Sequence, residues 1–245
     1  MIKGLILSLQ FLTRIPINIP VDFNEENLRK STFFFPLVGV ILGGLSGLVY
    51  YLFSFINIEL ASLLTVIAMI FFTGGLHLDG IADMFDGFMA NKDKEITLEI
   101  MKDSRIGTFG AVALILIIFS KYIVISNLRL NIPLILILSM ANSRIVVGHK
   151  MIYKKIARPG GLGDMFHRSN PKKYALSGAV LYIAIILLLK PLYLIPLFTT
   201  IVAGEIISSI TYKKIDGFTG DIYGATIEIG EIVSLITFMG VSIWI

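Results

Sequence analysis

Long apolar runs separated by short polar segments make up most of the chain. Crossing the hydrocarbon of a bilayer takes about 20 apolar residues, and a helix satisfies its own backbone hydrogen bonds in lipid. The pattern therefore predicts an all-α integral membrane protein with about seven transmembrane helices, within a range of six to eight. The predicted spans are 33–56, 60–78, 108–126, 132–148, 174–189, 191–210 and 224–245.

Two places leave the number of spans open. Lys190 and Pro191 divide the fifth run from the sixth, and because proline interrupts a helix, the two runs could also form one broken or re-entrant element. At the N-terminus, Gln10 and Arg14 interrupt a short apolar run, and no small-residue cleavage site follows. Residues 1–21 are therefore expected to form an interfacial or re-entrant segment and not a signal peptide.

The composition agrees with a membrane protein. Hydrophobic residues make up 56% of the 245 residues and charged residues 16%, against about a quarter charged in soluble domains. The mean hydropathy is +0.84. No linker or repeat divides the chain, so residues 1–245 are expected to form a single polytopic domain. The absence of cysteine excludes disulfides, thiolate metal sites and cysteine nucleophiles.

The distribution of basic residues predicts the orientation. A net charge of +4 could suggest nucleic-acid binding, but the lysines and arginines lie in short loops and form no continuous stripe. With the N-terminus in the cytoplasm, seventeen of the 21 lysines and arginines fall in cytoplasmic segments. Arg129 and Lys190 fall in external segments, and Lys121 and Arg144 lie within spans. Cytoplasmic loops are enriched in these residues, so we expect a multi-pass protein of the cell membrane with its polar clusters facing the cytoplasm.

The stretch GGLHLDGIADMFDGF, residues 74–88, contains the first candidate site. At 100° per helical residue, Asp83 and Asp86 lie at about +40° and −20° from Asp79, so the three carboxylates share one face. Three like charges repel one another there, and a bound divalent cation would remove the repulsion. All-oxygen ligands favour Mg²⁺, and also suit Mn²⁺. The alternative is a solvated loop whose acids cap the next helix.

The stretch KDSRIGTFG, residues 102–110, supplies a second set of candidates. Asp103 could accept a proton or ligate metal, and Arg105 could hold a phosphate through its planar guanidinium group. A local ion pair between the two, combined with a helix cap, would explain them equally well.

Acidic residues also accompany the last predicted span. Asp221 stands in a glycine-rich turn, and Glu228 follows two helical turns later on the same helix face, with Glu231 beyond it. Carboxylates inside a span are costly and are functional candidates for that reason. The alternative for Glu228 is an ion pair with Lys121 or Arg144 on neighbouring spans.

A basic, glycine-rich loop precedes the fifth span. In this loop, IARPGGLGDMFHRSNPKK, Arg158 is the best candidate for binding a phosphate. The lysines of the loop need no such role, because cytoplasmic loops of membrane proteins are rich in basic residues. Clustered carboxylates, basic loops and one shared membrane face together predict a membrane-embedded, metal-dependent transferase that acts on a diphosphate.

Several motifs resemble those of the cobalamin synthase family, the adenosylcobinamide-GDP ribazoletransferases. They are FLTRIP, FFFPLVGVILGG, LHLDGIADMFDGF, MKDSRIGTFGAVAL, ARPGGLG and GFTGDIYGATIEIGE, and they occur in the expected order between about residue 8 and about residue 235. One departure is the pair Gly160 and Gly161, where many relatives carry an acidic or other polar residue.

The resemblance implies a reaction and its substrates. A hydroxyl group of α-ribazole, or of its 5′-phosphate, attacks the phosphate attached to cobinamide in adenosylcobinamide-GDP and displaces GMP, with Mg²⁺ neutralising the diphosphate. The lipid bilayer is the other partner, and the sequence is compatible with a homo-oligomer. The residues implied are Asp103 and Arg105 for catalysis; Arg158, Gly217 and Thr219 for cofactor binding; and Asp79, Asp83, Asp86, Asp221 and Glu228 for metal.

Two other classes compete with this interpretation. A CDP-alcohol phosphotransferase would carry an Ala-Arg pair after Asp-Gly, where this chain has Ala82 and Asp83, and a membrane prenyltransferase would carry two similar aspartate-rich helices. A transporter would use Glu205, Glu228 and Lys121 along a path through the membrane, but no inverted repeat supports it.

Overall fold

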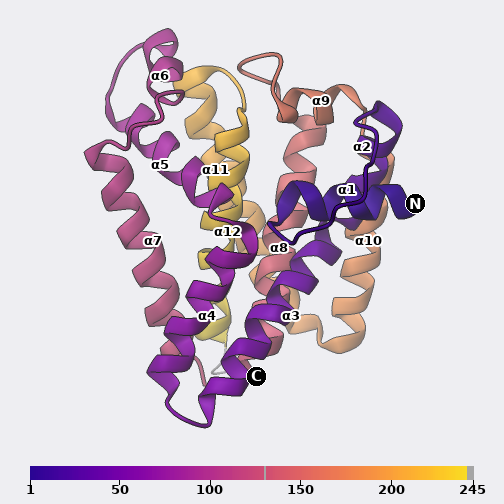
Figure 1. Ribbon diagram of the computed structural model, residues 1–245, viewed down its shortest axis with the longest axis vertical. Helices are drawn as coiled ribbons and strands as arrows, with labels where there is room; N and C mark the ends of the chain where they lie inside the picture. Colours follow the sequence, from indigo (N-terminus) through magenta and orange to yellow (C-terminus); the bar gives the residue numbers. More distant parts are fainter. Residues whose placement is uncertain (130, 242–245) are drawn as a thin grey trace.

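The computed structural model describes residues 1–129 and 131–241, and this part of the chain forms helices and no named strand. Short turns connect helices that stand mostly side by side in one bundle (Figure 1). The elements are α1 (Ile2–Leu12), α2 (Glu25–Ser31), η1 (Thr32–Phe34), α3 (Phe35–Ser54), α4 (Ile58–Thr73), α5 (Leu76–Met89), α6 (Lys94–Ile100), α7 (Thr108–Asn127), α8 (Ile132–Tyr153), α9 (Leu162–Arg168), α10 (Lys172–Leu189), η2 (Pro191–Tyr193), α11 (Leu194–Ile215) and α12 (Gly220–Val241).

Six helical segments in the described part of the chain are long and apolar enough to cross a membrane. They confirm an all-α multi-pass protein and correspond to six of the seven predicted spans. The predicted span 60–78 differs, because α4 ends early and the chain bends by 90° into α5. Residues 242–245 of the last predicted span lie outside the described residues. The six segments are α2 to α3, α7, α8, α10, η2 to α11, and α12.

The break at Lys190 and Pro191 separates two helices. The last helical hydrogen bond of α10 runs from Lys190 N to Ile186 O at 2.8 Å, and the chain then reverses through η2 into α11. Because α10 and α11 run in opposite directions (Figure 1), these residues connect two candidate spans and do not interrupt one.

The N-terminal segment begins with a short apolar helix that lies across the bundle (Figure 1). Gly4 packs against α2 so closely that a Cβ there would lie 3.0 Å from the Lys30 carbonyl carbon. The Phe11 ring packs against Phe35 of α3 and Phe166 of α9, with centroid distances of 6.2 and 4.6 Å. Aromatic packing therefore fixes α1 to the bundle.

A row of glycines on α3 allows its backbone to contact the backbone of α8. A Cβ on Gly39, Gly43 or Gly47 of α3 would lie 2.4 to 2.8 Å from backbone atoms of α8. Small residues four apart let two membrane helices approach until their backbones touch. The repeat V-G-V-I-L-G-G-L-S-G therefore places α8 in the centre of the bundle, where most of its residues are buried.

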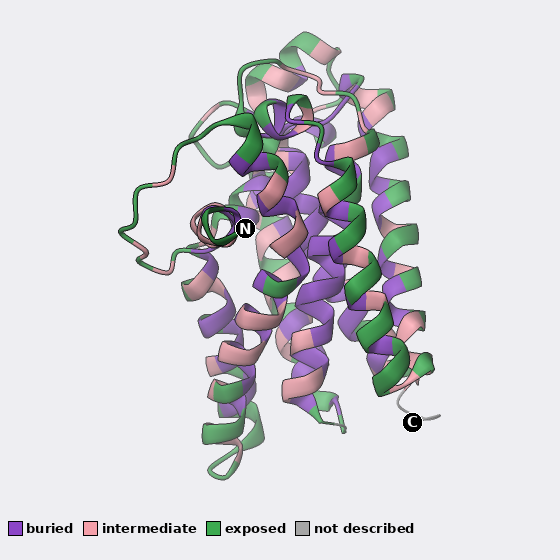
Figure 2. Cartoon of the chain, turned by 90° about the vertical axis from the view of Figure 1, so that its right-hand side faces the viewer, coloured by how far each residue is buried: buried purple, intermediate pink, exposed green. Residues whose placement is uncertain are grey.

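The outward faces of the bundle are apolar, whereas the polar connections gather at one of its ends. Exposed side chains are largely apolar along the outer helices, for example Leu188 at 88% and Phe71 at 72% exposure, as expected for lipid contact (Figure 2). In contrast, α6, α9 and the connection from α11 to α12 all lie at the same end (Figure 1). The predicted polar clusters therefore gather at one end of the molecule.

Candidate functional site

A glycine pair turns the chain into the helix that carries the aspartates. Gly74 and Gly75 have φ values of 63° and 70°, a left-handed conformation that only glycine adopts without strain. After the resulting bend, α5 begins at Leu76, and Asp79 stands in its first turn.

A backbone contact then brings α5 against the start of α12. A Cβ on Gly80 would lie 2.4 Å from the carbonyl oxygen of Asp221, and one on Gly224 would lie 3.3 Å from the Cα of His77. Glycine on both helices is what permits this approach. It sets Asp79 and Asp83 beside Asp221, which is distant from them in the sequence.

The four aspartates form one negatively charged cluster. The carboxylates of Asp79, Asp221 and Asp86 are all close enough to Asp83 for their charges to repel it. None of the ion pairs in the described part of the chain includes any of the four. Within residues 1–129 and 131–241, no three carboxylate or imidazole groups are arranged to hold a metal ion.

Asp86 has a structural contact of its own. Its two carboxylate oxygens accept hydrogen bonds from the backbone N–H groups of Gly107 and Gly110, at 2.7 and 2.8 Å. These are free N–H groups of the first turn of α7, so Asp86 caps that helix from outside. Each oxygen retains a second lone pair, and the predicted metal role of Asp86 stays a prediction.

Two loops pair to bring Arg158 to the aspartates. The backbone N–H of Ala157 donates to Phe218 O at 2.9 Å, and that of Phe218 donates to Lys155 O at 2.7 Å. A Cβ on Gly217 would lie 2.7 Å from the Ala157 nitrogen, so this glycine permits the pairing. As a result, the positive charge of Arg158 acts on Asp221.

Arg158 retains unused hydrogen-bonding capacity. Its Nη1 is buried and has no hydrogen-bond partner. The loop around it is held by Asp164 of α9, which accepts hydrogen bonds from the Gly160 N–H at 2.9 Å and from Arg168 Nε at 3.0 Å. The Gly160 hydrogen bond, with the Arg168 guanidinium, holds the pKa of Asp164 below its usual range.

Thr219 connects this turn to α12. Its hydroxyl donates to the Asp221 carboxylate at 3.1 Å and accepts a long 3.4 Å hydrogen bond from the backbone N–H of Ile222. Thr219 is buried and orients Asp221 in the first turn of the helix.

A cavity of about 400 Å³ adjoins the cluster. Asp79 and Asp221 stand on its wall, and the remaining lining is mostly apolar and aromatic. His77 and Tyr223 also line it, and His77 Nδ1 and the Tyr223 hydroxyl are buried without a hydrogen-bond partner.

Asp103 and Arg105 lie at the surface and bind each other. Arg105 Nη2 is 2.5 Å from Asp103 Oδ2, and the Arg105 side chain is 87% exposed. Hydrogen bonds from Arg105 lower the pKa of Asp103 to about 2. The structure thus shows the local ion pair that was the alternative for these residues, and neither residue lines the cavity.

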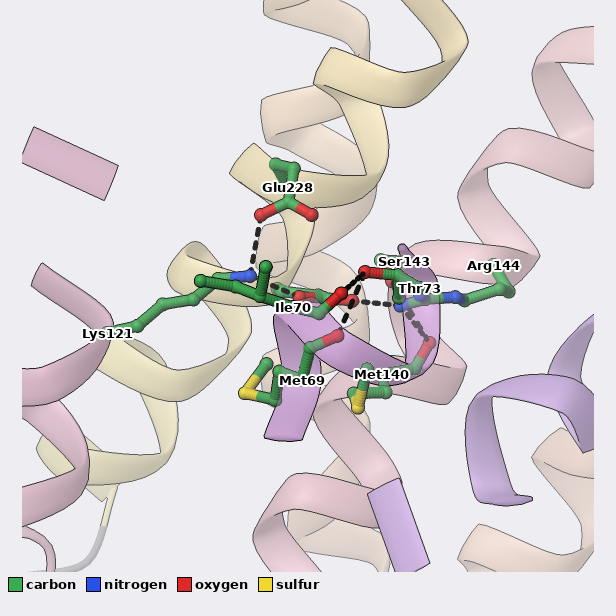
Figure 3. A network of polar contacts seen from close by, with 9 residues as sticks. Met69, Ile70, Thr73, Lys121, Met140, Ser143, Arg144 and Glu228 are labelled. Atoms are coloured by element: carbon green, nitrogen blue, oxygen red, sulfur yellow. Dashed lines mark hydrogen bonds and ion pairs between the residues drawn. The ribbon is translucent and has the colours of Figure 1, made fainter. Parts of the chain in front are cut away.

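Glu228 lies in a different part of α12 from the aspartate cluster. Its Oε2 is 2.7 Å from Lys121 Nζ (Figure 3). Lys121 also bonds Glu231, and Arg144 pairs with Glu231 in turn. Seven residues along a helix correspond to about 10 Å, and Glu228 bonds Lys121 at this distance along α12 from Asp221, so its predicted metal role stays a prediction. The structure therefore shows the ion pair that was the alternative for Glu228.

Sequence reasoning missed the residues that complete the cavity. His77 was visible two positions before Asp79, but a single histidine carries little signal. Phe11, Phe23 and Tyr223 resemble ordinary apolar residues of a membrane chain, and only the fold places them on one cavity.

Comparison with known proteins gives consistent results. The family described as cobalamin-5-phosphate synthase matches residues 4–239. A relative from Clostridium novyi (strain NT), named adenosylcobinamide-GDP ribazoletransferase, is 40% identical, covering 97% of this chain and 98% of its own. Relatives of the same name from Treponema denticola and Thermoanaerobacter pseudethanolicus are each 37% identical, over 96% and 99% of both chains. No solved structure matches.

Proposed function

The chain belongs to the cobalamin-5-phosphate synthase family, and from this premise we propose that it transfers adenosylcobinamide phosphate from adenosylcobinamide-GDP to α-ribazole or its 5′-phosphate. The observation that carries the proposal at the level of the site is the convergence of Asp79, Asp83 and Asp221 beside Arg158. Repelling carboxylates next to an arginine with a free N–H suit a diphosphate that arrives with a divalent cation.

We propose Mg²⁺ as that cation, with Mn²⁺ able to replace it. Four mutually repelling carboxylates without a cationic ion-pair partner form a donor set that a hard divalent ion would stabilise. Asp79, Asp83 and Asp221 are the primary ligands in this proposal, which requires their side chains to move together from the arrangement described above. Asp86 contributes less, since it already caps α7.

In the proposed reaction, different residues bind the phosphates, hold the metal ion and keep the ligands in position. The acceptor hydroxyl oxygen forms a bond to the phosphorus attached to cobinamide, the bond from that phosphorus to the GMP oxygen breaks, GMP leaves with the electron pair, and the hydroxyl proton is released to water. Bound Mg²⁺ would neutralise charge on the phosphoryl oxygens. Arg158 holds a phosphate through its free guanidinium N–H, while Thr219 and Asp164 keep Asp221 and the Arg158 loop in position.

We also propose that the site faces the cytoplasm. The elements that carry it lie at the end of the bundle where α6, α9 and the turn before α12 gather (Figure 1). Most of the lysines and arginines lie in the segments assigned to this end, as cytoplasmic loops require.

The test is GMP release by the purified protein in liposomes, given adenosylcobinamide-GDP, α-ribazole 5′-phosphate and Mg²⁺. Release is expected only with the acceptor present, and it should fall by more than about 100-fold in EDTA and in Asp83→Ala. Glu59→Ala, which removes an exposed carboxylate at the opposite end of α4, is the matched control and should retain activity. Absence of release from folded protein would redirect the search to CDP-alcohol or prenyl diphosphate substrates, and then to transport.

A further inference from the structure

The cavity beside the aspartates has the chemistry of a site for an aromatic ring. We propose that it binds the base of the acceptor nucleoside, and that the N-terminal segment, residues 10–23, forms one wall of this site. The inference rests on the proposed function, and it adds which substrate occupies the cavity and which part of the chain selects it.

The lining favours a flat apolar group. Val147, Met151 and Ile227 are 1% exposed or less and form an apolar surface contributed by α8 and α12. Phe11 and Phe23 from the N-terminal segment add aromatic rings to the same cavity. Aromatic side chains bind nucleobases by stacking, without requiring a specific hydrogen-bond pattern.

Two residues of the lining carry a polar atom without a partner. His77 Nδ1 and the Tyr223 hydroxyl are both buried, and no hydrogen bond in the described part of the chain satisfies them. A buried polar atom without a partner is unfavourable, and such atoms in a native fold point to a ligand or a bound water. The charges of Arg144, Glu231 and Lys121 act on His77, which places its imidazole beside the buried ion network. In the proposal, the Tyr223 hydroxyl therefore bonds the nucleoside and His77 does not.

The size and the lining of the cavity bear on which part of the substrates it holds. A corrin macrocycle is far larger than a cavity of about 400 Å³. A benzimidazole-type base has few hydrogen-bonding atoms and suits the apolar and aromatic side chains of the lining. Guanine, which presents several donors and acceptors along its edges, would have to bond the polar side chains instead, and it is the competing occupant in the test.

The position of the cavity fits the reaction. Asp79 and Asp221 stand on its wall, so a nucleoside whose base lies among the aromatic side chains presents its ribose to the proposed metal ligands. Arg158 and Thr219 line a separate small cavity of about 30 Å³, and Arg158 Nη1 is buried without a partner. In this arrangement Arg158 lies outside the cavity that binds the acceptor base, so it can bind the phosphates of the departing nucleotide.

The N-terminal segment is held in place by specific bonds. Gln10 Nε2 donates to the carbonyl oxygens of Ile17 and Ile19, both at 2.9 Å, which folds the segment back on itself. The Arg14 N–H donates to Phe72 O at 2.7 Å, next to the bend that leads into α5. These contacts tie the segment to the helix that carries the aspartates.

The experiment measures the KM for the acceptor and the KM for the donor in the variants Tyr223→Phe and Phe23→Ala. Tyr223→Phe removes a hydroxyl that has no partner in the protein, so it should fold normally and raise the KM for α-ribazole by about 2- to 10-fold. Phe23→Ala removes a half-exposed ring and should raise the same KM by roughly tenfold. The KM for adenosylcobinamide-GDP should change less than about twofold in both. Phe55→Ala, at a 74% exposed phenylalanine in the turn between α3 and α4, is the matched control.

Direct binding keeps this inference separate from the proposed function. Calorimetry with α-ribazole alone should show weaker binding in Tyr223→Phe and Phe23→Ala, and wild type should bind α-ribazole better than its adenine counterpart. Equal binding of the two nucleosides, or variants that change only the KM of the donor, would overturn the inference and leave the proposed function intact. Failure of acceptor-dependent GMP release in wild type would instead refute the proposed function.

Discussion

The buried ion network around Glu228 allows its structural role to be separated from a role in metal binding. Lys121 Nζ lies 2.7 Å from a Glu228 oxygen (Figure 3) and 2.5 Å from a Glu231 oxygen, and Arg144 pairs with Glu231. All four side chains are at most 5% exposed. Two cations therefore balance two carboxylates in the interior of the bundle.

The charge left unpaired in each variant predicts how much folding stability the variant loses. Lys121→Met leaves one unpaired negative charge and Glu228→Gln leaves one unpaired positive charge, and breaking a buried pair costs about 3–5 kcal/mol. The double variant keeps the Arg144–Glu231 pair and restores neutrality. Its loss of stability should be smaller than the sum of the single losses by at least about 2 kcal/mol.

The assay is reversible unfolding of the purified variants in mixed micelles, followed by circular dichroism, together with GMP release at varied Mg²⁺. We expect Glu228→Gln to lose stability while its residual activity needs the same Mg²⁺ concentration as wild type. Additive losses in the double variant would refute the network account. Unchanged stability with a raised Mg²⁺ requirement would restore Glu228 as a metal ligand.

Three further predictions concern the aspartate cluster, the contact between α3 and α8, and the pair of Asp103 and Arg105. Burial and the neighbouring aspartates raise the pKa of Asp83 to about 7, so at pH 8 Asp83→Asn removes one charge from the repelling cluster. Its unfolding free energy in EDTA at that pH should rise by roughly 1 kcal/mol, while the stabilisation that Mg²⁺ gives the wild type disappears. Gly43→Leu should prevent accumulation of folded protein, because a Cβ there would lie 2.4 Å from the α8 backbone, whereas Gly44→Ala, with nothing within 4 Å, should accumulate normally in a membrane-expression assay. Because the pKa of Asp103 is lowered to about 2, this group stays ionised at every pH above that value, and Asp103→Asn should leave the shape of the pH–rate profile between pH 5 and 9 unchanged.

Much of the fold could be predicted because hydrophobic run length is a strong signal in a membrane protein. Six of the seven predicted spans correspond to helices of suitable length. The exception arose where Gly74 and Gly75 stop α4 and turn the chain by 90°. An apolar run shows how much of the chain prefers lipid, but it does not show where two adjacent glycines with positive φ bend that run.

The helix packing was less predictable than the spans. The glycines of α3 were visible in the sequence, but their partner was not, because α8 is distant along the chain. Lys121 and Glu228 illustrate the same limit. Each was recognised as a costly intramembrane charge, and the sequence offered an ion pair with Lys121 or Arg144 only as the alternative to a metal role for Glu228. The fold shows that Lys121 and Glu228 do pair.

For the candidate site, the sequence grouped the residues better than it assigned their roles. The helical spacing placed Asp79, Asp83 and Asp86 on one face, and the structure adds Asp221 to the same cluster. Helix capping by these acids and a local ion pair between Asp103 and Arg105 were open alternatives, and the sequence could not choose between them and a role in the reaction. The structure shows that Asp86 caps α7 and that Arg105 binds Asp103 at the surface, because it supplies the hydrogen-bond partners.

The most direct test of the central claim, that aspartates of α5 and α12 form one divalent-cation site, is a Mn²⁺ titration followed by electron paramagnetic resonance. Purified wild type, Asp83→Asn, Asp221→Asn and Glu228→Gln would be compared in detergent, with Mg²⁺ as competitor. The account predicts Mn²⁺ binding that Mg²⁺ displaces in wild type and in Glu228→Gln, and that is lost in both aspartate variants. Binding that survives in the two aspartate variants, or that is lost only in Glu228→Gln, would contradict it.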